Sequence, residues 1–463
     1  MVNERILLCL AHMSGKEMDY IKEAFDQNWV VPLGPNVNGF EKDLEKFVNQ
    51  ISPMRNAQCT MRNEADVTQD AEGSMRSEAD GDNRKSDNCA SGISNCALNK
   101  KVVALSAGTA AVHLALIACG VKPGDEVMVQ SFTFCASSHP VTYLGATPVF
   151  VDSEWETWNM DPELLEEAIK DRIAKTGRKP KAIVPVALYG MPYRIDRIME
   201  IADRYEIPVI EDAAEGFGSR FDGQVLGTFG EYGVLSFNGN KMITTSGGGA
   251  LICPDEEKAR EILWYATQAR ESYPYYQHES IGYNYRMSNI CAGIGRGQMT
   301  VADEHISHHK HVQALYEELL KDVKGIKMHT APSAEFDSNY WLCTATLDPT
   351  LKIKGQEDAY GAVITGAVGG AAGVTHATEN VHTALEPNAN VEALRIYLDK
   401  ANIEARPLWK PMHTQPVYKD APRYTNGVSE SLFKVGICLP AGPWVSDDDV
   451  RYIGDTIKEA IEG

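Results

Sequence analysis

Short apolar runs alternate with longer amphipathic segments between residues 101 and 260. The runs are too short for helices and are rich in β-branched residues, whereas the segments between them have the length of helices. This alternation predicts a mainly parallel sheet that helices cover on both faces. The expected strands are 102–105, 126–130, 147–151, 182–188, 207–211, 233–237 and 249–253, and the expected helices are 110–119, 135–144, 162–174 and 195–205.

Two further helices are expected before this alternation begins. Ser14 is a candidate cap for a helix over 15–28, and an apolar face predicts a second helix over 40–50. The prolines of 31–35 predict a rigid turn between them.

Two unusual stretches interrupt the pattern and suggest the domain boundaries. Residues 51–98 are rich in Asn, Asp, Ser and Glu, bury little apolar surface, and are therefore expected to form a disordered insertion. A second insertion is expected near 355–390, around a Gly/Ala-rich tract. The remaining chain divides into an N-terminal segment, 1–50, which joins a large domain, 99–300, and a smaller C-terminal domain, 301–463.

A single lysine follows one of the predicted buried strands. The apolar run that ends at Phe237 leads into Asn-Gly-Asn, which is a turn signal, and Lys241 comes directly after it. Partial burial favours the neutral, nucleophilic form of an amine, so Lys241 is a candidate for a Schiff base. An ordinary surface lysine is the alternative when this stretch is taken alone.

Asp212 supplies a carboxylate at the end of another predicted strand. Ligands bind at such strand ends in parallel sheets, and a pyridoxal phosphate site needs a carboxylate for its ring nitrogen. At about 4 Å and an effective dielectric constant of 20, that interaction is worth roughly 4 kcal/mol. The alternative is an aspartate that caps the following helix.

Small residues after the strand 102–105 predict a phosphate cradle. Gly108 and Thr109 open an apolar helix, where backbone N–H groups and the helix dipole favour an anion. Ser236, five residues before Lys241, could add a hydroxyl group. An ordinary helix start is the alternative.

An aromatic ring is the remaining requirement of such a site. Phe134 is the candidate, and strand alternation would place Phe132 on the same side. Core packing is the alternative for both residues.

Taken together, these motifs resemble the DegT/DnrJ/EryC1 sugar aminotransferases. The segments GTAAVHLAL, LGATPVFVD, VIEDAAEGFGS, GYNYRMSN and RPLWKPMHTQPVY carry the resemblance, which covers most of 5–50, 100–350 and 391–460. It implies an α/β fold of the aspartate aminotransferase type (fold type I), a smaller C-terminal α+β domain, and pyridoxal 5′-phosphate as cofactor. FNGNK, ITTSGGG and RPLWKPMHTQ further resemble bacterial UDP-4-keto-6-deoxy-GlcNAc 4-aminotransferases of the bacillosamine pathway.

The resemblance also implies roles for individual residues. Lys241 would hold the cofactor as an internal aldimine and then move a proton, while Asp212 would support the ring nitrogen. Glu215 stands where the wider family often has Gln or His bonded to the cofactor's ring oxygen. Asn284 would reach the phosphate of a neighbouring subunit, which implies a homodimer.

A cluster of cations lies in the last resembling segment. Arg406, Lys410 and His413 are candidates for binding a nucleotide diphosphate or the carboxylates of the amino donor, which the resemblance implies is glutamate. A charged junction between a strand and a loop is the alternative.

Several other functions remain open or are disfavoured. No strand is followed by G-x-G-x-x-G and no Walker lysine motif appears, which disfavours a nicotinamide dehydrogenase. Some relatives carry His at the lysine position and act as sugar dehydratases, but this chain has Lys241. A different keto nucleotide sugar, of the GDP-perosamine or dTDP type, and a non-catalytic ligand- or partner-binding relative remain alternatives.

Composition narrows the partners and the compartment. The 463-residue chain has a net charge of −20 and no apolar run long enough for a membrane span, so neither nucleic acid nor a membrane is expected as a partner. Ten scattered cysteines without a C-x-x-C pair suggest the reducing cytoplasm. His305, His308, His309 and His311 cluster on a predicted helix, and the spacing from 305 to 308 and 309 would suit a metal. No carboxylate or cysteine completes a set, so a solvated helix face is expected.

Overall fold

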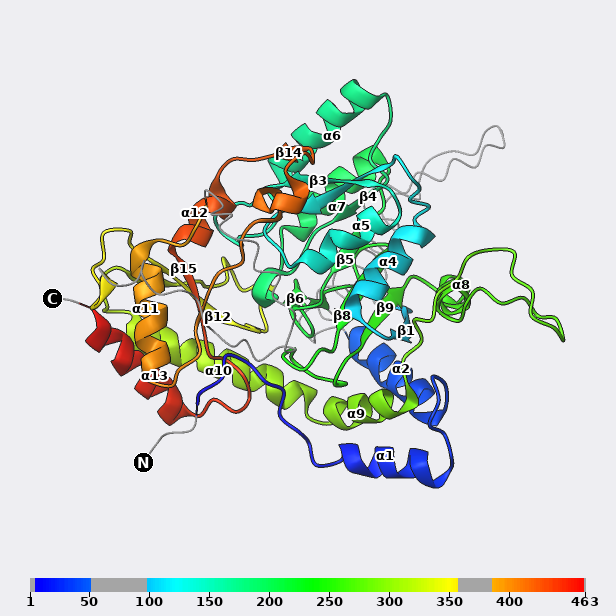
Figure 1. Cartoon of the computed structure of the whole chain (residues 1–463), viewed down its shortest axis with the longest axis horizontal. Helices are drawn as coiled ribbons and strands as arrows, with labels where there is room; N and C mark the ends of the chain where they lie inside the picture. Colours follow the sequence, from blue (N-terminus) through cyan, green and yellow to red (C-terminus); the bar gives the residue numbers. More distant parts are fainter. Residues whose placement is uncertain (1–4, 51–97, 357–384, 462–463) are drawn as a thin grey trace, which may run out of the picture.

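The computed structural model describes residues 5–50, 98–356 and 385–461, and its centre is one large sheet (Figure 1). The predicted insertions over 51–98 and 355–390 lie outside the described residues except at their edges. The described residues form a sheet unit with its covering helices and a second, smaller unit that contains the C-terminus (Figure 1).

Two four-stranded sheets, β1-β9-β8-β5 and β14-β3-β2-β4, lie edge to edge. Parallel bridges from Ile183 to Val209 and from Val186 to Asp212 join them into the large sheet. Neighbouring strands pair in parallel except at β9, which is antiparallel to β1 and β8. The strands are β1 (Lys101–Leu105), β2 (Glu126–Gln130), β3 (Thr147–Val151), β4 (Ala182–Val184), β5 (Ile210–Asp212), β8 (Tyr232–Ser236), β9 (Gly249–Cys253) and β14 (Arg423–Tyr424).

The strands β4 and β5 are shorter than the expected 182–188 and 207–211. Pro208 has no N–H group to donate, so the chain before β5 makes only a bridge to its neighbour. After β4 the chain leaves the sheet and forms a 3₁₀ turn, Leu188–Gly190, in which Tyr189 has a φ of 53°.

Helices cover the large sheet as the sequence pattern predicts, with one exception. The expected helix 135–144 is divided into a 3₁₀ turn, Cys135–Ser137, and the short helix α5 (His139–Tyr143), because Pro140 stands at the start of a new helix. The other covering helices are α4 (Gly108–Ala118), α6 (Pro162–Thr176), α7 (Ile195–Tyr205) and α8 (Glu256–Ala266).

The two N-terminal helices, α1 (Glu17–Asp26) and α2 (Pro35–Val48), both contact α9 (Asn289–Met299). The Ser14 side chain does not cap α1; the carboxylate of Glu17 instead accepts the N–H groups of Ser14 and Gly15. The expected start at residue 40 is wrong for α2, which begins at Pro35. The amide oxygen of Asn289 accepts the backbone N–H groups of the first turn of α2 and so stabilises this earlier start.

The smaller unit has its own antiparallel sheet in the order β10-β12-β15-β13. The long helix α10 leads from α9 into this unit, and α11 and α13 lie at its outer side (Figure 1). A small sheet of β11, β6 and β7 joins the two units. The elements are α10 (Ala302–Leu320), β10 (Ile326–Met328), β12 (Cys343–Leu347), α11 (Ala389–Lys400), β13 (Arg406–Pro407), α12 (Val428–Val435), β15 (Gly436–Leu439), α13 (Asp447–Ala460), β6 (Arg220–Phe221), β7 (Gln224–Val225) and β11 (Phe336–Asp337).

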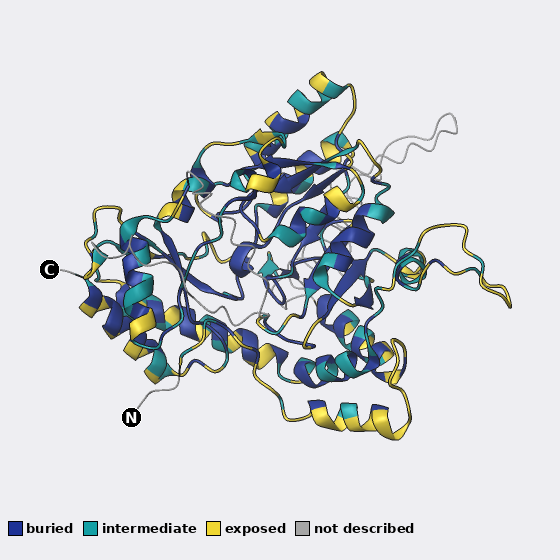
Figure 2. Cartoon of the chain, in the orientation of Figure 1, coloured by how far each residue is buried: buried dark blue, intermediate teal, exposed yellow. Residues whose placement is uncertain are grey.

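Burial follows this arrangement, since the central strands of both sheets are buried whereas α1 exposes much of its surface (Figure 2). The expected solvated face for the four histidines of α10 is wrong for two of them. His305 and His309 are buried, and their rings contact backbone carbonyl groups. Among the described residues, no group of three or more His, Cys, Asp or Glu side chains could hold a metal ion. No described helix has both the length and the apolar character needed to cross a membrane.

Candidate active site

A cavity of about 280 Å³ opens where the carboxyl ends of the parallel strands meet the start of α4. The last residues of β5 and β8, Asp212 and Ser236, lie in its wall. Strands of a parallel sheet all end at one edge, so residues that are far apart in the sequence come together here. The wall also contains Gly108, Thr109, Phe134, Ser137, Glu215, Lys241, Trp341 and Trp409.

Lys241 lies in the predicted turn, and its backbone N–H donates to the carbonyl of Asn238 at 3.0 Å. Its side chain is only 13% exposed. The Nζ atom lies 3.3 Å from Oε1 of Glu215 and 4.0 Å from the ring centroid of Trp341. The amine therefore lies inside the cavity between a carboxylate and an aromatic face.

Asp212 is buried at the end of β5 and has two hydrogen-bond donors. Ser137 Oγ donates to Oδ2 at 2.6 Å, and the backbone N–H of Ala214 donates to Oδ1 at 3.2 Å. Burial raises the pKa of Asp212, while the Ser137 hydroxyl, the Ala214 N–H and the nearby Lys241 act in the opposite direction. The carboxylate thus has partners that favour its charged form despite its burial.

Glu215 is buried beside Lys241, and its second oxygen is fixed by the protein backbone. The N–H of Tyr189 donates to Oε2 at 2.7 Å. Burial raises the pKa of Glu215 to about 7, the Lys241 amine and the Tyr189 N–H oppose that rise, and Asp212 adds to it. Near neutral pH the Glu215 side chain is therefore present both as the carboxylate and as the neutral acid.

The start of α4 has the features of an anion site. Ala107 is the N-cap residue and gives no side-chain cap, so the first N–H groups of the helix have no side-chain acceptor. A Cβ atom on Gly108 would lie 3.0 Å from Cβ of Ser236, and one on Gly249 would lie 2.4 Å from the Gly108 nitrogen. The backbone of Gly249 and the side chain of Ser236 thus lie close to the first residue of α4, and together they form a small cradle at the start of this helix.

The two phenylalanines have different surroundings. Phe134 is 54% exposed, lines the cavity and lies 5.4 Å from the ring of Trp409, measured between centroids. Phe132 has no exposed surface and packs edge-on against Tyr189. The expectation that both face one side is wrong, because β2 ends at Gln130 and strand alternation no longer applies.

These groups fit pyridoxal phosphate. The uncapped start of α4 with Ser236 would take the phosphate, the Asp212 carboxylate would take the ring nitrogen, and the Lys241 amine would take the aldehyde. Phe134 lies at the cavity wall, where a ring could stack on it. Each requirement of the cofactor has a matching group within one cavity.

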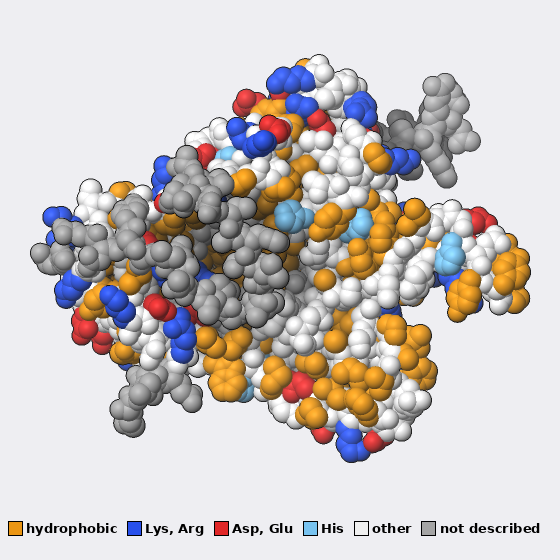
Figure 3. All heavy atoms as spheres, viewed as in Figure 1, with side chains coloured by type: hydrophobic (Ala, Val, Ile, Leu, Met, Phe, Trp, Pro, Cys, Tyr) orange, Lys and Arg blue, Asp and Glu red, His pale blue; other side chains and the backbone are white. Residues whose placement is uncertain are grey.

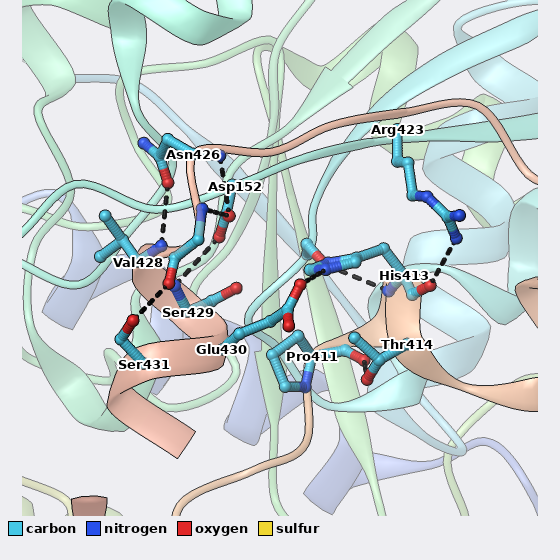
Figure 4. A network of polar contacts seen from close by, with 12 residues as sticks. Asp152, Pro411, His413, Thr414, Arg423, Asn426, Val428, Ser429, Glu430 and Ser431 are labelled. Carbon is cyan, nitrogen blue, oxygen red and sulfur yellow. Dashed lines mark hydrogen bonds and ion pairs between the residues drawn. The ribbon is translucent and has the colours of Figure 1, made fainter. Parts of the chain in front are cut away.

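The three cations of the last resembling segment do not lie in the wall of this cavity. Arg406 pairs with Glu404 at 2.6 Å, and Lys410 donates to the carbonyl of Leu385 at 2.9 Å. His413 is buried, with Nδ1 2.6 Å from Ser131 Oγ and Nε2 3.1 Å from Oε1 of Glu430 (Figure 4). Their roles toward a substrate therefore stay predictions.

Asn284 also lies away from the Lys241 cavity of its own chain. It lines a separate hollow together with Leu33, Arg270 and Tyr276. Its backbone makes an antiparallel bridge with Thr267, which places it beside the end of α8. A role in this chain's own cavity is not supported by that position.

Three residues of the cavity wall were not expected from the sequence. Ser137, Trp341 and Trp409 contact Asp212, Lys241 and Phe134, respectively. Trp409 lies in the segment RPLWKPMHTQ, whose resemblance to known sequences was a usable signal. Ser137 and Trp341 carry no such signal, because their contacts join segments far apart in the chain.

The fold and the fit of this cavity define a fold type I pyridoxal phosphate enzyme. The family model described as "DegT/DnrJ/EryC1/StrS aminotransferase family" matches residues 62–360 and 370–458. The chain belongs to this family of sugar aminotransferases, and its cofactor is pyridoxal 5′-phosphate.

Individual relatives agree with this assignment. "Putative pyridoxal phosphate-dependent aminotransferase EpsN" of Bacillus subtilis is 38% identical over 452 residues, which is 97% of this chain and 94% of that protein. GDP-perosamine synthase of Escherichia coli O157:H7 is 32% identical over 448 residues, or 96% of each chain. The crystal structure of a DegT DnrJ EryC1 StrS aminotransferase from Brucella abortus superimposes with a TM-score of 0.73 at 25% identity and covers 96% of this chain and 95% of that one.

Proposed function

We propose that this protein transfers an amino group from glutamate to C4 of a nucleotide-linked 4-keto-6-deoxy sugar. The first substrate to test is UDP-4-keto-6-deoxy-GlcNAc, because FNGNK and RPLWKPMHTQ resemble the aminotransferases that act on it. The observation that carries the proposal is the joint position of Lys241, Asp212 and the uncapped start of α4 around one cavity.

The residues of the cavity have distinct tasks in this proposal. When bound, pyridoxal phosphate would supply the electron sink for the transfer. Lys241 Nζ would take the proton from the donor's α-carbon and deliver it to C4′ of the cofactor. The Asp212 carboxylate holds a proton on the cofactor's ring nitrogen, and Ser137 Oγ keeps that carboxylate oriented. The same groups act in reverse order when the keto sugar replaces the keto acid.

A GDP-linked sugar is the second candidate substrate. Three relatives that are 30–32% identical to this chain are GDP-perosamine synthases, and each match covers at least 96% of this chain. A few pocket residues decide which nucleotide a site prefers, so the family alone does not choose between UDP and GDP. In either case Arg406, Lys410 and His413 are the proposed cations for the diphosphate or for the donor's carboxylates.

A homodimer with shared active sites is part of the same proposal. Asn284 lies in a hollow outside its own chain's cavity, and the exposed side chains of Leu33 and Tyr276 line the same hollow. Further exposed apolar side chains lie on α1 and on the loop after α8, along the lower and right-hand parts of the view (Figure 3). Exposed apolar surface of this kind is typical of a protein interface. The most exposed of these side chains are Met18, Phe25, Leu33, Tyr275, Tyr276 and Ile281.

The reaction can be tested with the full-length protein, pyridoxal phosphate and glutamate. UDP-4-keto-6-deoxy-GlcNAc and the keto precursor of GDP-perosamine would be offered separately, and the product mass and the release of 2-oxoglutarate would be measured. A 4-amino product from the UDP sugar supports the first candidate, and one from the GDP sugar alone supports the second. If glutamate is converted to 2-oxoglutarate but neither sugar is aminated, other keto sugars are the next substrates to test. No conversion of glutamate contradicts the proposed function.

The shared active site has its own test. Lys241→Ala and Asn284→Ala variants would be purified separately and then mixed under conditions that allow subunits to exchange. If Asn284 serves the partner's site, mixed dimers contain one site with both residues intact, and activity returns. Activity that stays at the level of the separate variants contradicts this arrangement.

Cytoplasmic localisation, expected from the scattered cysteines, remains a prediction.

A further inference from the structure

A tryptophan from the smaller unit reaches the lysine of the cavity. Trp341 lies between β11 and β12 and is only 3% exposed. The face of its indole lies 4.0 Å from Nζ of Lys241, and its Nε1–H donates to the carbonyl of Asn240 at 2.6 Å. One ring therefore contacts both the amine and the backbone directly before it.

Hydrogen bonds fix the position of this indole. The backbone N–H of Trp341 donates to Oδ1 of Asn339 at 2.8 Å. The Nδ2 group of the same asparagine donates to the carbonyls of Glu215 and Phe217 at 2.8 and 2.9 Å. Asn339 thus ties the tryptophan to the segment that carries the carboxylate partner of Lys241.

The carboxylate approaches the same amine as the indole. Oε1 of Glu215 lies 3.3 Å from Nζ, while Oε2 accepts the N–H of Tyr189. The ring of Tyr189 stacks with that of Trp341 at 6.5 Å with an angle of 20° between the planes. Both groups that contact the amine are therefore held by the surrounding chain.

We propose that Trp341 and Glu215 form the resting place of the Lys241 ammonium group whenever the lysine is free of the cofactor and carries a proton. Trp341 is then a positioning residue: its ring face attracts the cation, and its N–H keeps the turn before Lys241 in place. This inference rests on the proposed function only in taking Lys241 as the residue that the reaction sets free.

A physical reason supports this role. An ammonium group loses hydration in a cavity, and a carboxylate together with an aromatic face compensates for that loss. A neutral amine gains much less from either partner. The indole and Glu215 therefore hold the amine in place while it carries the proton taken from the donor.

The test uses the cofactor-free full-length protein, so it does not depend on the aminotransferase reaction. An amine-acylating reagent would label Lys241, and mass spectrometry of the peptides would give its rate at neutral pH relative to its plateau rate in strong alkali. The plateau corrects for changes in access to the cavity, and the exposed Lys352 serves as an internal reference. The variants are Trp341→Phe, Trp341→Leu and, as a matched control, Trp155→Leu, since Trp155 is exposed and lies outside this cavity.

The relative rate at neutral pH should rise about tenfold in Trp341→Leu, because the ring no longer favours the protonated amine. Trp341→Phe keeps a weaker ring face and should give a smaller rise, and the control should give none. An unchanged relative rate in Trp341→Leu overturns the proposal, even if the melting temperature falls. If Trp341→Leu does not fold, an unchanged rate in Trp341→Phe overturns it. Either negative result leaves the proposed aminotransferase function untouched.

Discussion

Removing the hydroxyl group of Ser137 should weaken cofactor binding through Asp212. Ser137 Oγ donates to Oδ2 of Asp212 at 2.6 Å in a buried setting, and Thr133 Oγ1 lies 2.8 Å from the same hydroxyl. In Ser137→Ala the carboxylate keeps only the weaker contact with the Ala214 N–H, at 3.2 Å. The substitution retains Cβ, so little packing is lost, and it removes the hydrogen bonds of this hydroxyl to Asp212 and to Thr133.

The size of the effect follows from the charge on the acceptor. A hydrogen bond to a charged group contributes about 1.5–3 kcal/mol net, which corresponds to roughly a tenfold to hundredfold loss of cofactor affinity. The pH dependence follows from the pKa of Asp212, which burial already raises and which the Ser137 hydroxyl lowers. Without that hydroxyl the pKa rises further, so the carboxyl group becomes neutral at a higher pH. The loss of affinity should therefore increase as the pH falls.

The assay is a titration of cofactor-free protein with pyridoxal phosphate, followed by absorbance at several pH values. Ser138→Ala is the matched control, because Ser138 is also buried but its hydroxyl donates to the carbonyl of Cys135. Asp212→Asn gives the effect of removing the charge itself. If Ser137→Ala binds the cofactor like the wild type at every pH while Asp212→Asn does not, the hydrogen bond has no such role and this reasoning is refuted.

Three further predictions concern the cradle, the acidic neighbour of the lysine and the fold. Gly249→Ala places a Cβ atom 2.4 Å from the Gly108 nitrogen, so cofactor affinity and melting temperature should both fall, whereas Gly239→Ala, outside the cavity wall, meets no atom within 4 Å and should change neither. Burial raises the pKa of Glu215 from 4.5 to about 7, so between these values the unfolded chain releases this proton first and stability falls as the pH rises. Glu215→Gln should flatten that fall in a profile of melting temperature against pH, and an unchanged slope would count against the raised pKa. Asp152→Ala leaves three backbone N–H groups around the start of α12 without their acceptor (Figure 4), so chemical denaturation should show a loss of at least about 3 kcal/mol.

Much of the large sheet could be predicted from the sequence because its strands are short apolar runs with turn signals on both sides. β1, β2, β3 and β9 agree with the expected strands to within one residue. The prediction fails where side chains or prolines from elsewhere decide the geometry. The start of α2 depends on Asn289, more than 250 positions away, and β5 is shortened by Pro208.

The cavity shows the same division between local and distant causes. Lys241 and Gly108 each follow a strand and Asp212 ends one, and the topology of a parallel sheet brings such residues to one edge. Trp341 reaches the cavity from the smaller unit, so its contact with Lys241 joins positions one hundred residues apart. No local pattern encodes that contact, and no periodicity separates Phe134 in the cavity wall from Phe132 in the core.

The central claim is that Lys241 forms the bond to the cofactor, and chemical trapping tests it most directly. The full-length protein would be loaded with pyridoxal phosphate, treated with borohydride, digested, and analysed by mass spectrometry. We predict a cofactor-derived mass on the peptide that contains Lys241, and no such mass and no visible absorption band in Lys241→Ala. A trapped cofactor on another lysine, or a band that persists in Lys241→Ala, would contradict the account.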